Sequence, residues 1–129
     1  MPYYLEFDKD NKVLCTTFEG RYSFADFLSS GEATHRHTLE KNPVAGIWDI
    51  SEVTHFDISS VDIYKLADTF SIYPLGVSRF VVVSSDYVYG RLRMWQGLSE
   101  KNRPELQVVR TREEAYQMLG LQGMKLERV

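Results

Sequence analysis

The segment Trp48–Ser60, WDISEVTHFDISS, joins an apolar run to a polar stretch. The run VAGIWDI, which begins at Val44, is typical of a short strand buried on both faces of a sheet. After Asp49 the residues are mostly polar, and apolar residues at helical spacing follow from Ile63. The segment therefore predicts a strand that ends near Asp49, a polar loop, and the start of a helix.

Strands and helices alternate on both sides of this segment. YYLEF and KVLCTTFEG predict an antiparallel hairpin, because the polar turn DKDN joins them. SRFVVVSS and LQVVR predict two further strands. Helices are expected over residues 23–37, 63–70, 86–102 and 111–120. Helices between successive strands imply parallel pairs with right-handed crossovers. The expected fold is one α/β domain over residues 1–129, with a mixed sheet covered by about four helices.

Capping residues mark the expected helix ends. Ser23 with Asp26 fits the start of the first helix, and Thr111 with Glu114 forms a T-x-x-E capping box before the last one. Two further positions complete the set: Asp86 as the cap of the third helix and Gly120 as the C-terminal cap of the last.

Composition and charge narrow the class of protein. The 129 residues are 43% hydrophobic and 26% charged, which is an ordinary globular balance. Residues 1–78 carry 12 acidic and 6 basic side chains, and residues 79–129 carry 6 and 9, so the chain as a whole is not expected to bind nucleic acid. No apolar run approaches the roughly 20 residues of a membrane helix. No signal peptide is visible, and the single cysteine, Cys15, excludes an internal disulfide, so we expect a cytoplasmic protein.

The polar stretch also resembles a known family. DISEVTHFDISS, from Asp49 to Ser60, is similar to the strand–loop–helix signature D-L-S-x-V-x-x-I-D-S-S-G of STAS domains, the anti-sigma-factor antagonists. YGRLRM, from Tyr89 to Met94, resembles a third-helix motif of small SpoIIAA-like proteins, also described as STAS/SEC14-like. The resemblance covers roughly residues 3–120 and implies the SpoIIAA-like (STAS) architecture.

One position departs from this signature. In antagonists regulated by phosphorylation, the acceptor is the serine directly after the loop aspartate, and Ile58 stands there in this chain. Ser59 matches the second serine, and Ser60 replaces the glycine. Phosphorylation of Ser59 or Ser60 is therefore a separate hypothesis. Asp57, Ser59 and Ser60 are also all good helix caps, and capping alone would explain them.

The candidate binding residues lie where strands are expected to end and helices to begin, which is where open α/β sheets bind ligands. Exposed tyrosine and arginine are also enriched in binding hot spots, and a guanidinium group can chelate an anion. The candidates are Asp49, Asp57, Ser59, Ser60, Asp86, Tyr89, Arg91 and Arg93.

The sequence contains no recognisable catalytic motif, and we predict no catalytic residue, metal or cofactor. His35 and His37 would point in different directions on a helix, and His55 is distant in sequence. Cys15 lies between apolar neighbours and is expected to be a small core residue.

Three hypotheses for function follow. The leading one is a non-enzymatic regulatory domain that binds a protein partner. The alternative, implied by the SEC14-like resemblance, is a carrier of an apolar, anionic small molecule, with Arg91 or Arg93 at the head group. Its cavity would be lined by Phe24, Phe27, Tyr64, Phe70, Met94 and Trp95, although the same residues would serve as ordinary core.

The third hypothesis is an enzyme, which would need a pocket around Asp49, Asp57 or a histidine. Homodimerisation through a sheet edge or a helix face is a further hypothesis.

Overall fold

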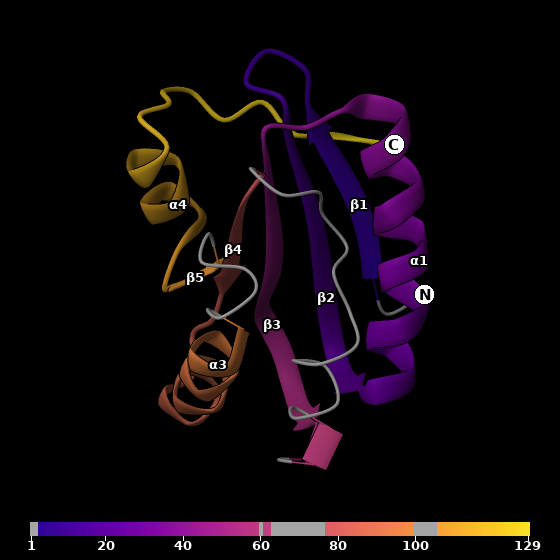
Figure 1. The fold of residues 1–129 in the computed structure, drawn as a ribbon, viewed down its shortest axis with the longest axis vertical. Helices are drawn as coiled ribbons and strands as arrows, with labels where there is room; N and C mark the ends of the chain where they lie inside the picture. Colours follow the sequence, from indigo (N-terminus) through magenta and orange to yellow (C-terminus); the bar gives the residue numbers. More distant parts are fainter. Residues whose placement is uncertain (1–2, 60, 63–76, 100–105) are drawn as a thin grey trace.

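The computed structural model of the 129-residue chain describes residues 3–59, 61–62, 77–99 and 106–129, apart from the side chains at positions 91, 94–99 and 106. Figure 1 shows its elements in chain order: β1 (Tyr3–Asp8), β2 (Val13–Ser23), α1 (Phe24–Lys41), β3 (Ala45–Asp57), β4 (Ser78–Val82), α3 (Asp86–Ser99), β5 (Leu106–Val109), α4 (Arg112–Met118) and β6 (Glu127–Arg128). The helix predicted over residues 63–70 lies outside the described residues. The described part contains three helices, and none of them is long and apolar enough to cross a lipid bilayer.

The sheet is mixed, as the sequence predicts. Its strand order is β5-β4-β3-β2-β1-β6, in which β1 is antiparallel to β2 and the pairs β2–β3, β3–β4 and β4–β5 are parallel. The short strand β6 pairs antiparallel with the outer edge of β1. The sequence shows no signal for β6, because two residues are too few to display a strand pattern.

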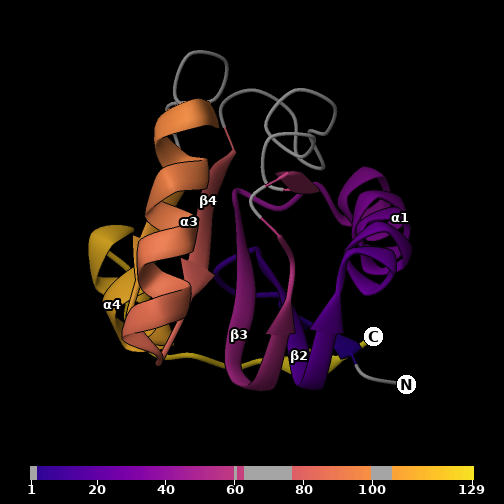
Figure 2. The same cartoon turned by 90° about the horizontal axis from the view of Figure 1, so that it is seen from below.

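Helices cover both faces of this sheet (Figures 1 and 2). On one face, α1 and α3 pack over a core in which Phe18 and Phe27 contact Trp48, with ring centroids 5.2 and 4.9 Å apart. On the other face, Ala115 and Tyr116 of α4 pack over a second apolar cluster of strand residues. The sheet is therefore buried between two layers, which explains why the first halves of β2 and β3 and nearly all of β4 are buried.

The predicted end of the third strand is wrong. β3 continues past Asp49 to Asp57, because the 11-residue strand β2 pairs with it as far as Ser23 opposite Asp57. β3 has 13 residues, and its two extra residues lie at two register shifts in this pairing. The rings of Tyr22 and Phe56 stack across the extension, with centroids 5.8 Å apart. The polar stretch that suggested a loop is thus a strand with one exposed face.

The cap at Ser23 is confirmed. Its side chain accepts a hydrogen bond from the backbone of Asp26, whose carboxylate accepts one in return. The helix runs four residues beyond the predicted end at His37. It stops at Lys41 because Asn42 adopts the left-handed conformation (φ 50°) and donates its N–H to the carbonyl of Thr38.

The caps of the later helices are partly as predicted. The Thr111 side chain accepts the N–H of Glu114 at 3.0 Å, which confirms that cap. Leu119, rather than Gly120, caps the end of α4, and Gly120 follows with φ 72°. Asp86 is not the cap of α3. Ser85 takes this place because its Oγ accepts the N–H of Val88, and Asp86 is the first helical residue.

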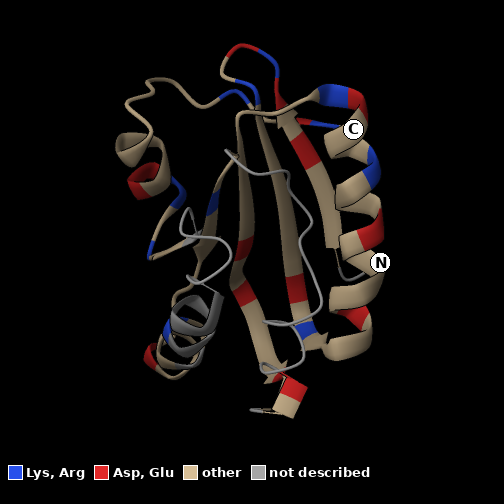
Figure 3. Ribbon diagram, viewed as in Figure 1, with Lys and Arg blue, Asp and Glu red and all other residues tan. Residues whose placement is uncertain are grey.

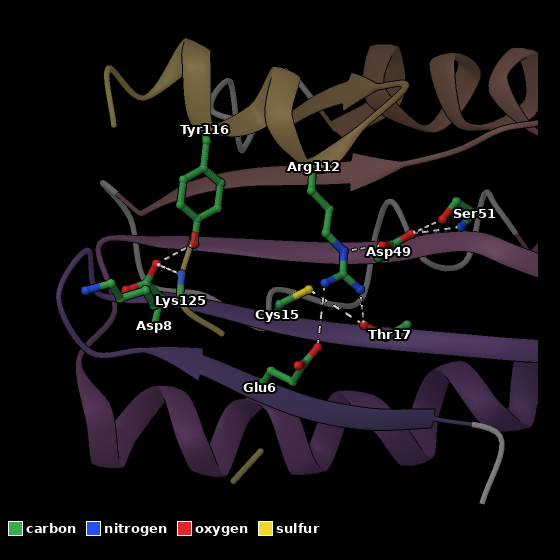
Figure 4. A network of polar contacts seen from close by, with 9 residues as sticks. All are labelled: Glu6, Asp8, Cys15, Thr17, Asp49, Ser51, Arg112, Tyr116 and Lys125. Carbon is green, nitrogen blue, oxygen red and sulfur yellow. Dashed lines mark hydrogen bonds and ion pairs between the residues drawn. The ribbon is translucent and has the colours of Figure 1, made fainter. Parts of the chain in front are cut away.

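A buried carboxylate, Asp8, connects the turn after β1 with α4 and the C-terminal segment (Figure 4). It accepts hydrogen bonds from the backbone and side chain of Asn11, from the Tyr116 hydroxyl at 2.8 Å and from the Lys125 backbone at 3.2 Å. Burial alone would raise the pKa of Asp8, but the hydrogen bonds from Asn11, Tyr116 and Lys125 outweigh it and lower that pKa below its usual value. The hairpin turn, α4 and the C-terminal segment therefore depend on one negative charge.

We predict that Asp8→Asn lowers the free energy of unfolding at pH 7 by about 2 kcal/mol, because charge-assisted hydrogen bonds are lost. Since the folded-state pKa is depressed, the Asp8 contribution is present above the ordinary carboxyl pKa and is lost as pH falls through the folded value. Urea unfolding from pH 7 to pH 3 should show the two proteins converging below about pH 4. Asp10→Asn is the control, because that side chain is 70% exposed. A constant difference across this range would contradict the prediction.

Candidate functional site

The structure distributes the predicted site residues over three places. Asp49 lies between the sheet and α4, Asp57 and Ser59 lie at the far end of β3, and Asp86 and Tyr89 begin α3. β4 ends at Val82 opposite Asp49, while β3 runs on for eight residues. At about 3.3 Å per residue this extension is about 26 Å long. Figure 2 accordingly shows the end of β3 apart from the start of α3. Asp57 and Ser59 therefore do not form one site with the other two groups.

Asp49 belongs to a polar network around Arg112 (Figure 4). Arg112 Nε donates to Asp49 Oδ2 at 2.5 Å, Nη2 donates to Thr17 Oγ1 at 2.8 Å, and Nη1 lies 3.6 Å from Glu6 Oε1. The other oxygen of Asp49 accepts the N–H and hydroxyl of Ser51. The Asp49 side chain is 5% exposed and that of Arg112 22%. Both oxygens of Asp49 are thus engaged, and the pair anchors α4 to the sheet.

Burial would lower the pKa of Arg112, but Cys15, Asp49 and Glu6 outweigh it and raise that pKa. The guanidinium group is therefore permanently charged. The sequence analysis missed Arg112, although a signal exists. A cation in the first turn of a helix opposes the helix dipole, and such a residue calls for a specific acidic partner.

We predict that Arg112→Met destabilises the fold by about 3 kcal/mol, because it leaves the buried Asp49 carboxylate uncompensated. The double variant Asp49→Asn, Arg112→Met should lose less than the sum of the two single variants, since neither then leaves a lone charge. Chemical denaturation of all four proteins measures this coupling. Strictly additive losses would show that the pair is energetically inert.

Cys15 is fully buried beside this network, which confirms the prediction of a core residue. Burial raises the pKa of its thiol to about 12, and the nearby Arg112 offsets only part of that rise. A thiol with this pKa is almost entirely protonated at neutral pH and is a poor nucleophile.

We predict that the native protein resists a thiol reagent at pH 8, and that one thiol per chain reacts after unfolding in guanidinium. A Glu40→Cys variant supplies the control, because that position is exposed on α1 and its new thiol should react at once. Rapid modification of Cys15 in the native wild-type protein would contradict the burial described above.

The second group gathers around Arg110, another residue that the sequence analysis missed. Arg110 donates to Asp86 Oδ1 at 2.5 Å and to the Ser84 carbonyl at 3.1 Å, and its guanidinium group lies 4.4 Å from the centre of the Tyr89 ring. Ser84 in turn donates its hydroxyl to the carbonyl of Ser51. These contacts join the middle of β3 and the segments after β4 and β5 to α3. The position of Arg110 directly after the last apolar strand was a usable signal, because strand ends meet at this edge.

A small open hollow of about 240 Å³ lies between the first two groups. Its lining residues are Asp49, Ser51, Val82, Arg110, Thr111, Arg112 and Glu113. Asp49 is the one residue of the enzyme hypothesis within it, and its carboxylate is already held by Arg112 and Ser51. The hollow therefore offers no free acid or base at Asp49 for catalysis.

The third group lies at the end of β3. Arg21 Nη1 contacts Asp57 Oδ2 at 2.8 Å, and the two side chains are 67% and 40% exposed. Ser59 Oγ accepts the N–H of Asp62, and the Asp62 carboxylate accepts the N–H of Ser59, both at 3.2 Å. This reciprocal pair is a capping box, and residues 61–62 after it are helical. Of the three predicted caps, Ser59 thus fills the role.

Two apolar side chains beside this cap differ in exposure: one is buried and the other lies on the surface. Ile58 is 4% exposed and belongs to the core that contains Trp48, whereas Val61 is 63% exposed. We call the exposed set Arg21, Asp57, Ser59 and Val61 the Asp57 edge. It combines a charged pair, a hydroxyl and an apolar side chain on the surface. Figure 3 shows basic and acidic positions close to each other where β2 and β3 end.

The remaining predicted residues are less informative. Arg93 is exposed on α3, while Ser60 and the side chain of Arg91 lie outside the described residues. His35 and His37 belong to α1 and His55 to β3. Within the described residues, no three acidic, cysteine or histidine side chains come together as metal ligands.

The comparisons with known proteins bear on the fold. No protein-family model and no curated protein matches the sequence. Among solved structures, an anti-sigma factor antagonist from Mycobacterium paratuberculosis matches with a TM-score of 0.66 and 19% identity, over 92% of each chain. The anti-sigma factor antagonist SpoIIAA in its unphosphorylated form matches with a TM-score of 0.60 and 15% identity, over 94% of this chain and 99% of that one. The chain therefore has the SpoIIAA-like (STAS) fold that its sequence motifs suggested.

Proposed function

We propose that this chain is a non-enzymatic regulatory domain that binds a protein partner through the Asp57 edge. The observation that carries the proposal is the exposed Arg21–Asp57 pair beside the exposed Val61, at the cap of a helix. The fold supports it, because two solved proteins with this fold are described as anti-sigma factor antagonists. A cytoplasmic location is part of the same proposal.

The Arg21–Asp57 ion pair can be replaced by contacts with a partner. An ion pair between exposed side chains contributes little to stability, so breaking it during binding costs little. Charges at the rim of an interface chiefly guide the encounter and fix its orientation. Val61 would supply the apolar contact that desolvates at the centre of such an interface.

The edge would act without a phosphorylation switch at Ile58. That side chain has no hydroxyl, and it is turned into the core rather than toward solvent. The neighbouring Ser59 hydroxyl already serves as a cap, with the Asp62 carboxylate bonded to the same residue. A phosphate on Ser59 would place negative charge beside that carboxylate. Phosphorylation of Ser59 or Ser60 remains a separate prediction.

We predict that Asp57→Lys removes the native partner in pull-downs from the source cell, quantified by mass spectrometry against the wild-type protein. The charge-swapped variant Arg21→Asp, Asp57→Arg should also lose it, because the ion pair is kept but its direction is reversed. Asp86→Lys is the matched control, since it changes an exposed acid in a different group. Circular dichroism checks that each variant is folded.

Retention of every wild-type partner by both Asp57 variants would refute the role of this edge. Equal loss with Asp86→Lys would instead locate recognition at the start of α3 or spread it over both groups. The carrier hypothesis stays a prediction: Phe27 packs in the core against Trp48, while Tyr64, Phe70 and the side chains of Met94 and Trp95 lie outside the described residues.

A further inference from the structure

The outer side of α1 carries two large exposed apolar side chains. Leu28 is 43% exposed and Leu39 is 66% exposed, although both belong to a helix whose other side is buried in the core. Between them lie the exposed charges Glu32 and Arg36. At 3.6 residues per turn, these four positions fall within an arc of about 80°, so they form one continuous stripe. Figure 3 shows red and blue bands along this helix.

The charges of this stripe are not paired with each other. Glu32 and Arg36 have the i, i+4 spacing and the order that favour an ion pair within a helix. Their side chains nevertheless make no ion pair within the described part of the structure. Both charges are therefore available to opposite charges on another molecule.

Read from its N-terminal end, the stripe is apolar, acidic, basic and apolar. A second copy of α1, lying antiparallel, presents the same side chains in reverse order. Leu28 then meets Leu39 of the second copy, and Glu32 meets Arg36. The midpoint of the two leucines and the midpoint of the two charges lie half a residue apart, about 0.75 Å along the helix axis. One two-fold axis therefore satisfies all four contacts at once, which is the requirement of an isologous dimer.

We propose that this stripe, formed by Leu28, Glu32, Arg36 and Leu39, is a homodimer interface in which α1 packs against α1 of a second copy. Complementary charges select a second copy over an arbitrary apolar partner, since each acid finds a base only in the antiparallel register. A single helix pair buries less than the roughly 1,200–2,000 Å² of a stable interface, so the dimer is weak and depends on concentration. This interface is independent of the Asp57 edge.

Charge reversal gives a sharp test by sedimentation velocity over a wide range of protein concentration. Glu32→Arg alone, or Arg36→Glu alone, places like charges opposite each other twice per dimer and should weaken dimerisation at least about tenfold. The double variant Glu32→Arg, Arg36→Glu is again self-complementary and should restore the wild-type dissociation constant to within a few-fold. Leu28→Glu should abolish the dimer.

Glu114→Arg is the control. Glu114 is an exposed glutamate on α4, which covers the other face of the sheet, and its reversal should leave the dimer unchanged. Circular dichroism establishes that each surface variant is folded. A wild-type protein that stays monomeric at the highest concentration would overturn the proposal. A dimer that resists both single reversals, or that the double variant fails to restore, would overturn it equally.

Discussion

The parallel pairing of β2 with β3 is the constraint on which the rest of the structure depends. It runs from Val13 opposite Ala45 to Ser23 opposite Asp57, and these two strands form the middle of the sheet. Its first half is buried on both faces and carries the two cores. Its second half extends beyond β4, and it ends where α1 begins on one strand and where the Ser59 cap begins on the other. The length of this pairing therefore separates the Asp57 edge from the start of α3.

The second face of the sheet is held by polar contacts as well as by apolar packing. α4 has only seven residues, and it buries Ala115 and Tyr116. Two polar anchors compensate for this small contact. Arg112 binds Asp49 at the beginning of the helix, and Asp8 binds Tyr116 in its last turn. Each anchor joins segments that are far apart in the sequence, so a loss at either would weaken the attachment of α4 to the sheet.

The sequence predicts the fold well because its signals are local. The capping pair at Ser23, the apolar strand that begins at Ser78 and the helical spacing of each amphipathic segment are all visible in short windows. The end of β3 was mispredicted for the opposite reason. Its polar residues after Asp49 look like a loop in isolation, and only the pairing with the second half of β2 makes them a strand.

The candidate site was harder to predict, because its connections are long-range. Arg110 and Arg112 reach acids that lie 24 and 63 residues away, and no local pattern indicates those partners. Grouping Asp49 with Asp57 also assumed that both lie at the end of their strand. The buried position of Asp49 in the middle of β3 removes it from the surface and leaves the recognition role to residues farther along.

Ile58 connects the fold to the proposed function. At the start of a helix, a serine in this position could point either to solvent or into the core. An isoleucine there gains free energy when it is buried. Its 4% exposure shows that the core is the environment adopted, together with Trp48. The backbone before the Ser59 cap is thereby fixed by the apolar packing of Ile58 and by the strand pairing of Asp57 with Ser23. A surface held in this way presents a constant shape to a partner, which favours regulation by binding equilibrium and concentration over covalent switching at this position.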